Sequence, residues 1–183
     1  MNPLESAASP QAAPAEALPR ILRMQVAVLM LREAKPNVWE DWRFRLLDVW
    51  PDDGRFGLAA GAPHCLRQDD HMTEWAFPGL TLELYPDEAE GYQLNLTSGQ
   101  PVWFVMWRVD DEDPSLAAPE RVTLSYLEAG RLLDAQERVD NCPLPPDMVE
   151  LLQAYTEAHY HPEPRRRQRP ASFRAPDERG RKP

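Results

Sequence analysis

Apolar residues at every second position predict two strands near the start of the chain. Residues 21–31 alternate in this way, with methionine and valine gathered on one side. Residues 39–50, WEDWRFRLLDVW, place aromatic and aliphatic residues on one face and mostly charged residues on the other. Because successive side chains of a strand point to opposite faces, both segments read as strands with one buried face. The turn sequence Pro-Asp-Asp-Gly at residues 51–54 closes an antiparallel pair.

Shorter segments of the same kind follow, interrupted by glycine and proline. The run 102–109, VWFVMWRV, is apolar on both faces, which is typical of a central strand. Pro78-Gly79 and Ser98-Gly99 have the composition of turns. We therefore expect strands around Leu58 and over residues 72–77, 80–84, 92–96, 102–109 and 122–124.

The last third of the chain changes to a helical period. Ser125 is followed three residues later by glutamate, a capping-box spacing that predicts a helix to about residue 136. Residues 145–160 begin with Pro-Pro-Asp and carry apolar residues on one helical face, which predicts a second helix. The predicted fold class is α+β: a mostly antiparallel sheet of six or seven strands, as a partly closed barrel or a sandwich, followed by two C-terminal helices.

Composition divides the chain into three parts. Residues 1–19 are rich in Ala, Pro, Glu and Ser without periodicity, and residues 163–183 have almost nothing to bury, so both are expected to be disordered. Residues 20–162 are expected to form a single α+β domain. The N-terminus lacks the basic start and apolar core of a secretory signal, and the longest apolar run is far below the roughly 20 residues that span a bilayer. The expected location is the cytoplasm, without membrane insertion.

The net charge of −10 conceals an asymmetry. Residues 165–183 contain eight basic and two acidic residues and so carry +6, which leaves −16 on the rest. An acidic body repels nucleic acid, whereas a basic tail attracts it. The tail is therefore a separate candidate for partner binding.

The residue types that usually carry catalysis occur without the required spacing. Cys65 and Cys142 form no CxxC pair, and His64 and His71 lack further ligands at metal-site spacing. The acidic run 110–113 lacks the glycine and spaced ligands of a calcium loop and reads as a solvated loop tip. Serine-hydrolase, P-loop and dinucleotide-binding motifs are also missing from the sequence. We predict no catalytic, cofactor-binding or metal-binding residue.

Tryptophan and arginine supply the candidate partner-binding residues, since these two types dominate interface hot spots. Most of the six tryptophans are expected in the core. A patch on the second strand and the tail remain as binding candidates. The residues are Trp39 and Trp42, with Arg43 and Arg45 as a polar rim, and Arg165, Arg166, Arg167 and Arg169 in the tail.

Three segments of the chain resemble a domain-of-unknown-function family of uncharacterised proteobacterial proteins. They are VAVLMLREAKPNVWEDWRF, YPDEAEGYQLNLTSGQPVWFVMWR and YLEAGRLLDAQERVDNCPLPPDMVELLQAYTEAHYHPEPRRRQR. The shared features include the tryptophans of the second strand, the YxLNL segment at 92–96, and a proline-led last helix with His159 near its end. The resemblance covers roughly residues 22–169.

The resemblance implies a context, because genes of this family often lie near those of molybdenum-dependent formate dehydrogenase. It implies a non-enzymatic accessory, maturation or regulatory protein of a formate dehydrogenase-type molybdoenzyme, with enzyme subunits as protein partners. A nucleic-acid- or ribosome-binding module acting through the tail is the alternative. Some relatives carry the label of molybdenum-cofactor biosynthesis enzymes, a less favoured second alternative because no glycine-rich nucleotide loop follows the first strand.

Overall fold

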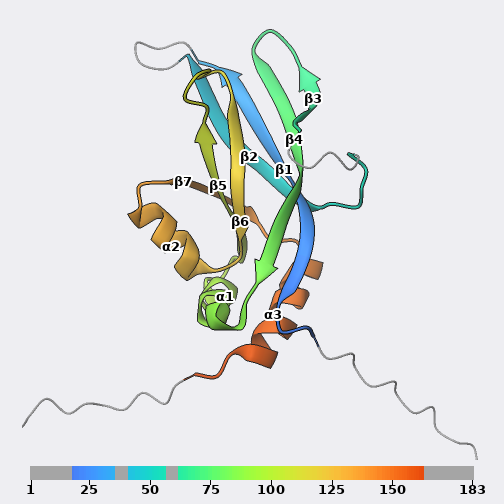
Figure 1. Cartoon of the computed structure of the whole chain (residues 1–183), viewed down its shortest axis with the longest axis vertical. Coiled ribbons are helices and arrows are strands. Elements are labelled where there is room, and N and C mark those ends of the chain that lie inside the picture. Colours follow the sequence, from blue (N-terminus) through green and yellow to red (C-terminus); the bar gives the residue numbers. More distant parts are fainter. Residues whose placement is uncertain (1–17, 36–40, 57–61, 163–183) are drawn as a thin grey trace, which may run out of the picture.

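The computed structural model describes residues 18–35, 41–56 and 62–162. Its strands form two antiparallel sheets, and its helices gather mainly at one end (Figure 1). Within the described residues the elements are β1 (Leu22–Ala34), β2 (Trp42–Pro51), β3 (His64–Gln68), β4 (Met72–Leu84), a 3-10 turn η1 (Pro86–Glu88), α1 (Ala89–Thr97), β5 (Val102–Val109), β6 (Ala117–Thr123), α2 (Tyr126–Asp134), β7 (Arg138–Pro143) and α3 (Pro146–His159).

The two sheets have the strand orders β2-β1-β4-β3 and β6-β5-β7. They approach each other where β4 meets β6 and where β2 meets β7. At the second contact the backbone N–H of Leu46 donates to Oδ2 of Asp140 at 3.3 Å. The mostly antiparallel α+β class and the strand number are confirmed, but a single sheet is wrong, and the described strands do not close into a barrel.

β4 corrects the prediction of two strands separated by a turn at Pro78-Gly79. It runs unbroken from Met72 to Leu84, and its pairing with β1 shifts between Val26 and Val28, opposite the Pro-Gly pair. Proline has no N–H for the ladder, and Gly79 adopts a positive φ of 79°. The pair therefore makes a bulge within a long strand, as these two residue types do where a sheet bends.

Residues 92–96 correct a second prediction, because they belong to helix α1 and not to a strand. The residues buried in α1 include Ala89, Tyr92 and Asn95, which are three positions apart and share one helical face. Leu94, which the strand pattern placed with the buried residues, is 41% exposed. Five residues of alternating polarity are too few to distinguish the two periods, and a buried asparagine is invisible to a hydrophobic pattern.

The C-terminal third confirms two helices and adds a strand between them. The Ser125 hydroxyl accepts a hydrogen bond from the Glu128 backbone N–H at 3.1 Å, as the capping box predicts. β7, missed by the sequence pattern, pairs with β5 and completes the second sheet. The short β3 was also missed, and the strand expected around Leu58 lies outside the described residues.

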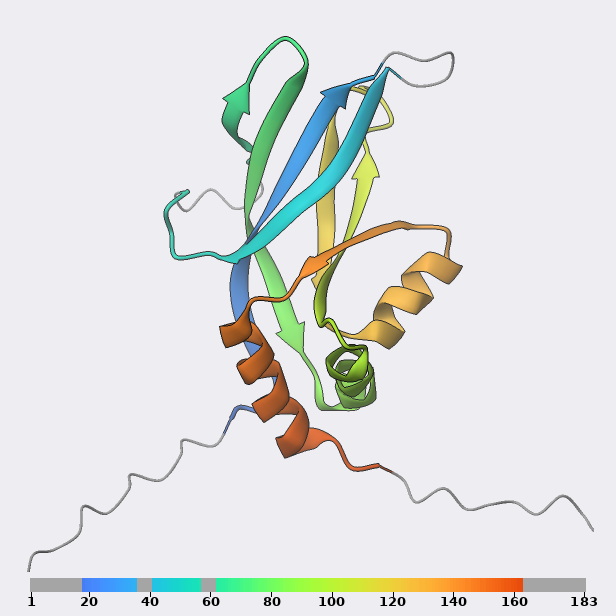
Figure 2. The same ribbon diagram turned by 180° about the vertical axis from the view of Figure 1, so that it is seen from behind.

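One core joins both sheets to α1 and α3. Its largest fully buried side chains include Trp103 of β5, Tyr92 of α1 and Tyr155 of α3. Figure 2 shows α1 and α3 side by side at one end of the sheets, with β2 and β7 on the near side. No helix among the described residues is both long and apolar enough to cross a membrane. The expected domain limits stay predictions, since residues 1–17 and 163–183 lie outside the described part.

Candidate binding cleft between the sheets

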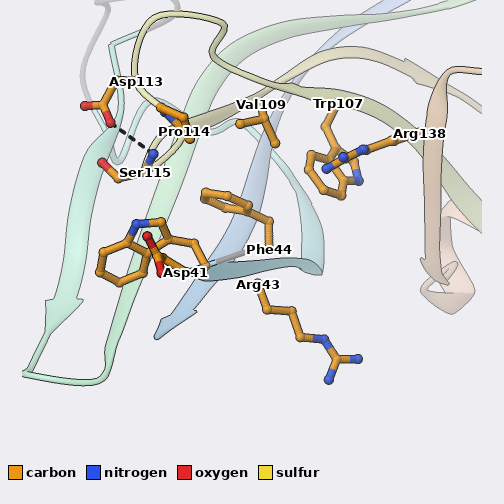
Figure 3. Close-up of a pocket in the computed structure, with 10 residues that line it drawn as sticks. Asp41, Arg43, Phe44, Trp107, Val109, Asp113, Pro114, Ser115 and Arg138 are labelled. Atoms are coloured by element: carbon orange, nitrogen blue, oxygen red, sulfur yellow. Dashed lines mark hydrogen bonds between the residues drawn. The ribbon is translucent and has the colours of Figure 1, made fainter. Parts of the chain in front are cut away.

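A cleft of about 540 Å³ opens between β2 and the second sheet (Figure 3). It lies near the start of β2, at the end of the sheets away from α1 and α3 (Figure 1). β2 forms one wall, while β5, the loop between β5 and β6, and the start of β7 form the other. Its lining residues are Asp41, Trp42, Arg43, Phe44, Trp107, Val109, Asp113, Pro114, Ser115 and Arg138. We call this space the β2–β5 cleft.

Aromatic side chains form the apolar part of the cleft. Trp42 and Phe44 are two positions apart on β2 and so lie on the same face of the strand. The rings of Phe44 and Trp107 lie 6.0 Å apart between centroids and are tilted by 53°, a common geometry for packed aromatic pairs. Trp42 and Phe44 are each only partly buried, so their rings remain available to a bound molecule.

Arg32 of β1 packs beside this wall, on the face of the sheet that carries Trp42 and Phe44. Its guanidinium lies 4.2 Å from the ring centroid of Trp42 and 5.0 Å from that of Trp75, a double cation–π contact. It also donates through Nη1 to the Ser115 carbonyl at 2.9 Å and through Nη2 to Thr73 Oγ1 at 3.2 Å. Arg32 thus ties the first sheet to the loop that closes the far side of the cleft.

The cleft has ends of opposite charge. Figure 3 shows Asp41 and Asp113 on one side and Arg138 on the other. Hydrogen bonds from Ser115, with a smaller contribution from the nearby positive charge of Arg32, lower the pKa of Asp113 from its ordinary value. Asp113 therefore stays ionised at neutral pH. Arg138 is exposed and lies over the Trp107 ring at 5.3 Å, without an ion pair to any described residue.

Trp107 carries a buried polar group that has no partner within the protein. The side chain is 6% exposed, and its Nε1–H has no hydrogen-bond partner among the described residues. Four other buried side-chain atoms share this condition, namely Arg32 Nε, His64 Nε2, Trp103 Nε1 and His159 Nε2. Of these residues, Trp107 lines the cleft itself.

The structure places the predicted binding residues in different surroundings. Trp42 lines the cleft, and Arg43 lies at its edge with its guanidinium directed away from Phe44 and Trp107 (Figure 3). Arg45 is absent from the cleft lining and instead pairs with Glu33 at 3.3 Å on the surface. The remaining candidates, Trp39, Arg165, Arg166, Arg167 and Arg169, lie outside the described residues.

Eight of the ten lining residues were not among the predicted site residues, and neither was Arg32, which contacts Trp42. The apolar patterns place Trp107 and Phe44 in the core. Arg138 lies on β7, a strand that the sequence pattern does not predict. Arg32 did carry a signal, because it continues the apolar side of β1 after Val28 and Met30. An arginine at an inward position must find partners for its charge, and Arg32 finds them in two tryptophans.

The two cysteines differ in exposure and reactivity. Cys65 is exposed on β3, whereas Cys142 is buried in β7. Burial raises the pKa of the Cys142 thiol to about 12, so it stays protonated near neutral pH and is a poor nucleophile. Across the described parts of the chain, no group of three or more His, Cys, Asp or Glu side chains is arranged to hold a metal ion.

Comparison with known sequences gives a family and no nearer relative. The family model described as "Protein of unknown function (DUF3305)" matches residues 25–169, which include every residue that lines the cleft. No curated protein and no solved structure matches the chain.

Proposed function

The chain belongs to the DUF3305 family, and we propose that it is a non-enzymatic accessory protein that binds a protein partner through the β2–β5 cleft. The partner we propose is a subunit of a formate dehydrogenase-type molybdoenzyme, whose maturation or regulation the protein would assist. The proposed location is the cytoplasm.

The composition and shape of the cleft carry this proposal. Trp42, Phe44 and Trp107 present aromatic surface beside Arg138, and tryptophan and arginine are the residue types most enriched in interface hot spots. The arginine stacked on Trp107 and the aspartates at the far end add polar groups that would orient a partner segment. The cleft volume of about 540 Å³ is enough for several side chains of a partner.

The choice of partner rests on the resemblance of three segments to proteins encoded near formate dehydrogenase genes. It is therefore tested separately from the cleft. The tagged full-length chain is expected to co-purify with the dehydrogenase subunits from cells that express both at natural levels. A deletion strain is expected to lose most of its formate dehydrogenase activity.

The role of the cleft is tested by the double variant Trp42→Ala/Phe44→Ala in the full-length chain. Both side chains are only partly buried, so the variant is expected to fold and to lose at least tenfold in recovered dehydrogenase. The matched control is Leu133→Ala, which removes a 55% exposed apolar side chain from α2. Absence of co-purification together with normal dehydrogenase activity in the deletion strain would refute the proposal.

A nucleic-acid- or ribosome-binding module is the alternative, and the charge of +6 over residues 165–183 favours it. It requires binding that weakens steeply with salt and is lost on truncation after Pro164. Binding to the dehydrogenase subunits that survives this truncation would favour the accessory role. A cofactor-biosynthesis enzyme remains the less favoured third reading, to be tested by nucleotide binding to the full-length chain.

A further inference from the structure

The outer edge of β2 points backbone groups into the cleft. The Asp41 carbonyl accepts a hydrogen bond from the Lys35 N–H at 2.9 Å and so faces β1, whereas the Leu46 N–H faces away from β1, toward Asp140. Backbone groups of successive strand residues alternate in direction. The N–H and C=O groups of Trp42 and Phe44 therefore point to the same side as those of Leu46, away from β1.

β7 covers this edge only in part. Asp140 meets the backbone of Leu46, and β7 begins at Arg138, which pairs with Trp107 of β5. Trp42 and Phe44 lie nearer the start of β2 and line the cleft instead. The described residues thus leave a short sheet edge without a neighbouring strand, and such an edge is a template for pairing with another chain.

The groups around this edge are backbone donors and acceptors together with one cation. They are the N–H and C=O groups of Trp42 and Phe44 and the exposed guanidinium of Arg138. The molecule itself shows a group to which such an N–H donates, since the next outward N–H, that of Leu46, donates to the Asp140 carboxylate. The complementary groups are therefore the backbone N–H and C=O groups of an extended segment and a carboxylate for Arg138, while Asp41 and Asp113 at the far end suit a basic side chain.

We propose that an extended peptide segment of the partner adds to the first sheet as a strand along β2 at Trp42–Phe44. Its alternate apolar side chains pack on Phe44 and Trp107, an acidic side chain pairs with Arg138, and a basic one lies near Asp41 and Asp113. This inference rests on the proposed protein-binding function and specifies its mode. Strand addition gives affinity through main-chain hydrogen bonds and specificity through the alternate side chains.

Selection from a library of seven-residue peptides displayed on phage tests the chemistry of the segment. Panning against the full-length chain is expected to enrich alternating apolar sequences with an acid toward one end and a base toward the other. The Arg138→Glu variant is expected to bind the selected peptide at least tenfold more weakly and to recover when the peptide's acid is replaced by lysine. Arg121→Glu, which changes the same type of residue on β6, is the control and should have less than a twofold effect.

Backbone pairing is tested with synthetic copies of the selected peptide that carry one N-methyl group each. Methylation at alternate positions, where the peptide N–H faces β2, is expected to reduce affinity at least tenfold, with less than twofold loss at the positions between. In the protein, hydrogen exchange of the Trp42 and Phe44 backbone amides is expected to slow when the peptide binds. The amides of Arg43 and Arg45 face β1 and are already protected without the peptide. Failure to enrich such peptides, or binding that ignores N-methylation, would overturn the proposal.

The two proposals fail in distinguishable ways. If the dehydrogenase subunits co-purify and the Trp42→Ala/Phe44→Ala variant loses them, but no strand-type peptide binds, protein binding stands and strand addition is wrong. If peptides bind with alternating sensitivity to N-methylation but no dehydrogenase subunit co-purifies, strand addition stands and the partner is wrong.

Discussion

The two ends of the molecule differ in how their buried polar groups are hydrogen-bonded. At the helical end, the Asn95 side chain donates to the carbonyls of Val102 and Leu124 at 2.8 and 3.0 Å and accepts from the Val102 N–H at 3.0 Å. The Tyr155 hydroxyl lies 2.9 Å from the Leu84 carbonyl. These bonds join α1 to the second sheet and α3 to the first. His159 Nε2 and Trp103 Nε1 are exceptions at this end.

At the cleft end, donors are buried without partners and aromatic rings are partly exposed. The Nε1–H of Trp107 and the Nε–H of Arg32 have no partner among the described residues, and Trp42 and Phe44 stay half-buried. An unpaired buried donor costs about 1–3 kcal/mol. The comparison teaches that the helical end stabilises the fold, whereas the cleft end keeps interactions available for binding.

The largest expected effect comes from Asn95→Ala at the helical end. The substitution leaves two carbonyls and one N–H without their partner inside the core, where each lost partner costs about 1–3 kcal/mol. We expect the free energy of unfolding to fall by about 4 kcal/mol, measured by urea denaturation. The control is Gln153→Ala, an exposed amide on α3, which should stay within about 0.5 kcal/mol. A loss below about 1 kcal/mol for Asn95→Ala would break the comparison.

Two helical glycines give the next largest difference. A Cβ at Gly91 of α1 would lie 2.1 Å from Ser125 Oγ, the cap of α2, whereas a Cβ at Gly130 of α2 would meet nothing within 4 Å. Gly91→Ala must displace the cap and is expected to destabilise the protein by about 3 kcal/mol. Gly130→Ala is expected to stabilise it by about 0.5–1 kcal/mol, because alanine favours a helix. Thermal unfolding of both variants checks the pair, and equal shifts would contradict the close packing of α1 against Ser125.

The same contrast explains how much of the fold the sequence could predict. β1, β2 and β5 carry long alternating or continuous apolar patterns, and Ser125 and Pro145 mark helix starts, so local signals were enough. α1 was not predictable in this way, because its buried face includes Asn95 and Gly91, whose value lies in contacts with distant residues. The period of hydrophobic residues along a sequence identifies only the apolar residues of a buried face.

The cleft was less predictable than the fold for a related reason. Trp42 and Arg43 were identified because tryptophan and arginine on one strand suggest a binding surface. Phe44 meets Trp107 and Arg138 only because β2 of one sheet faces β5 and β7 of the other. That arrangement depends on how two sheets approach each other, which no local pattern specifies.

The smallest expected effect on stability sharpens the comparison most, because it separates two tryptophans of the same strand. Trp103 is fully buried and Trp107 lines the cleft, and neither Nε1–H has a partner in the described residues. Trp103→Phe leaves an internal cavity and is expected to cost about 2 kcal/mol even after the unpaired donor is removed. Trp107→Phe loses its volume beside an open cleft, so we expect a change within about 1 kcal/mol, measured by urea denaturation.

Binding should rank these two variants in the opposite order. Trp107→Phe reduces the aromatic wall of the cleft on which we place an apolar side chain of the partner segment. The affinity of this variant for the selected peptide is expected to fall about tenfold, measured by fluorescence anisotropy of a labelled peptide. Trp103 lies in the core, so Trp103→Phe should change the affinity of the folded protein for the peptide less than twofold. If Trp107→Phe bound the peptide normally, Trp107 would be a packing residue and not part of the recognition surface, and the distinction between the two ends would rest on Trp42 and Phe44 alone.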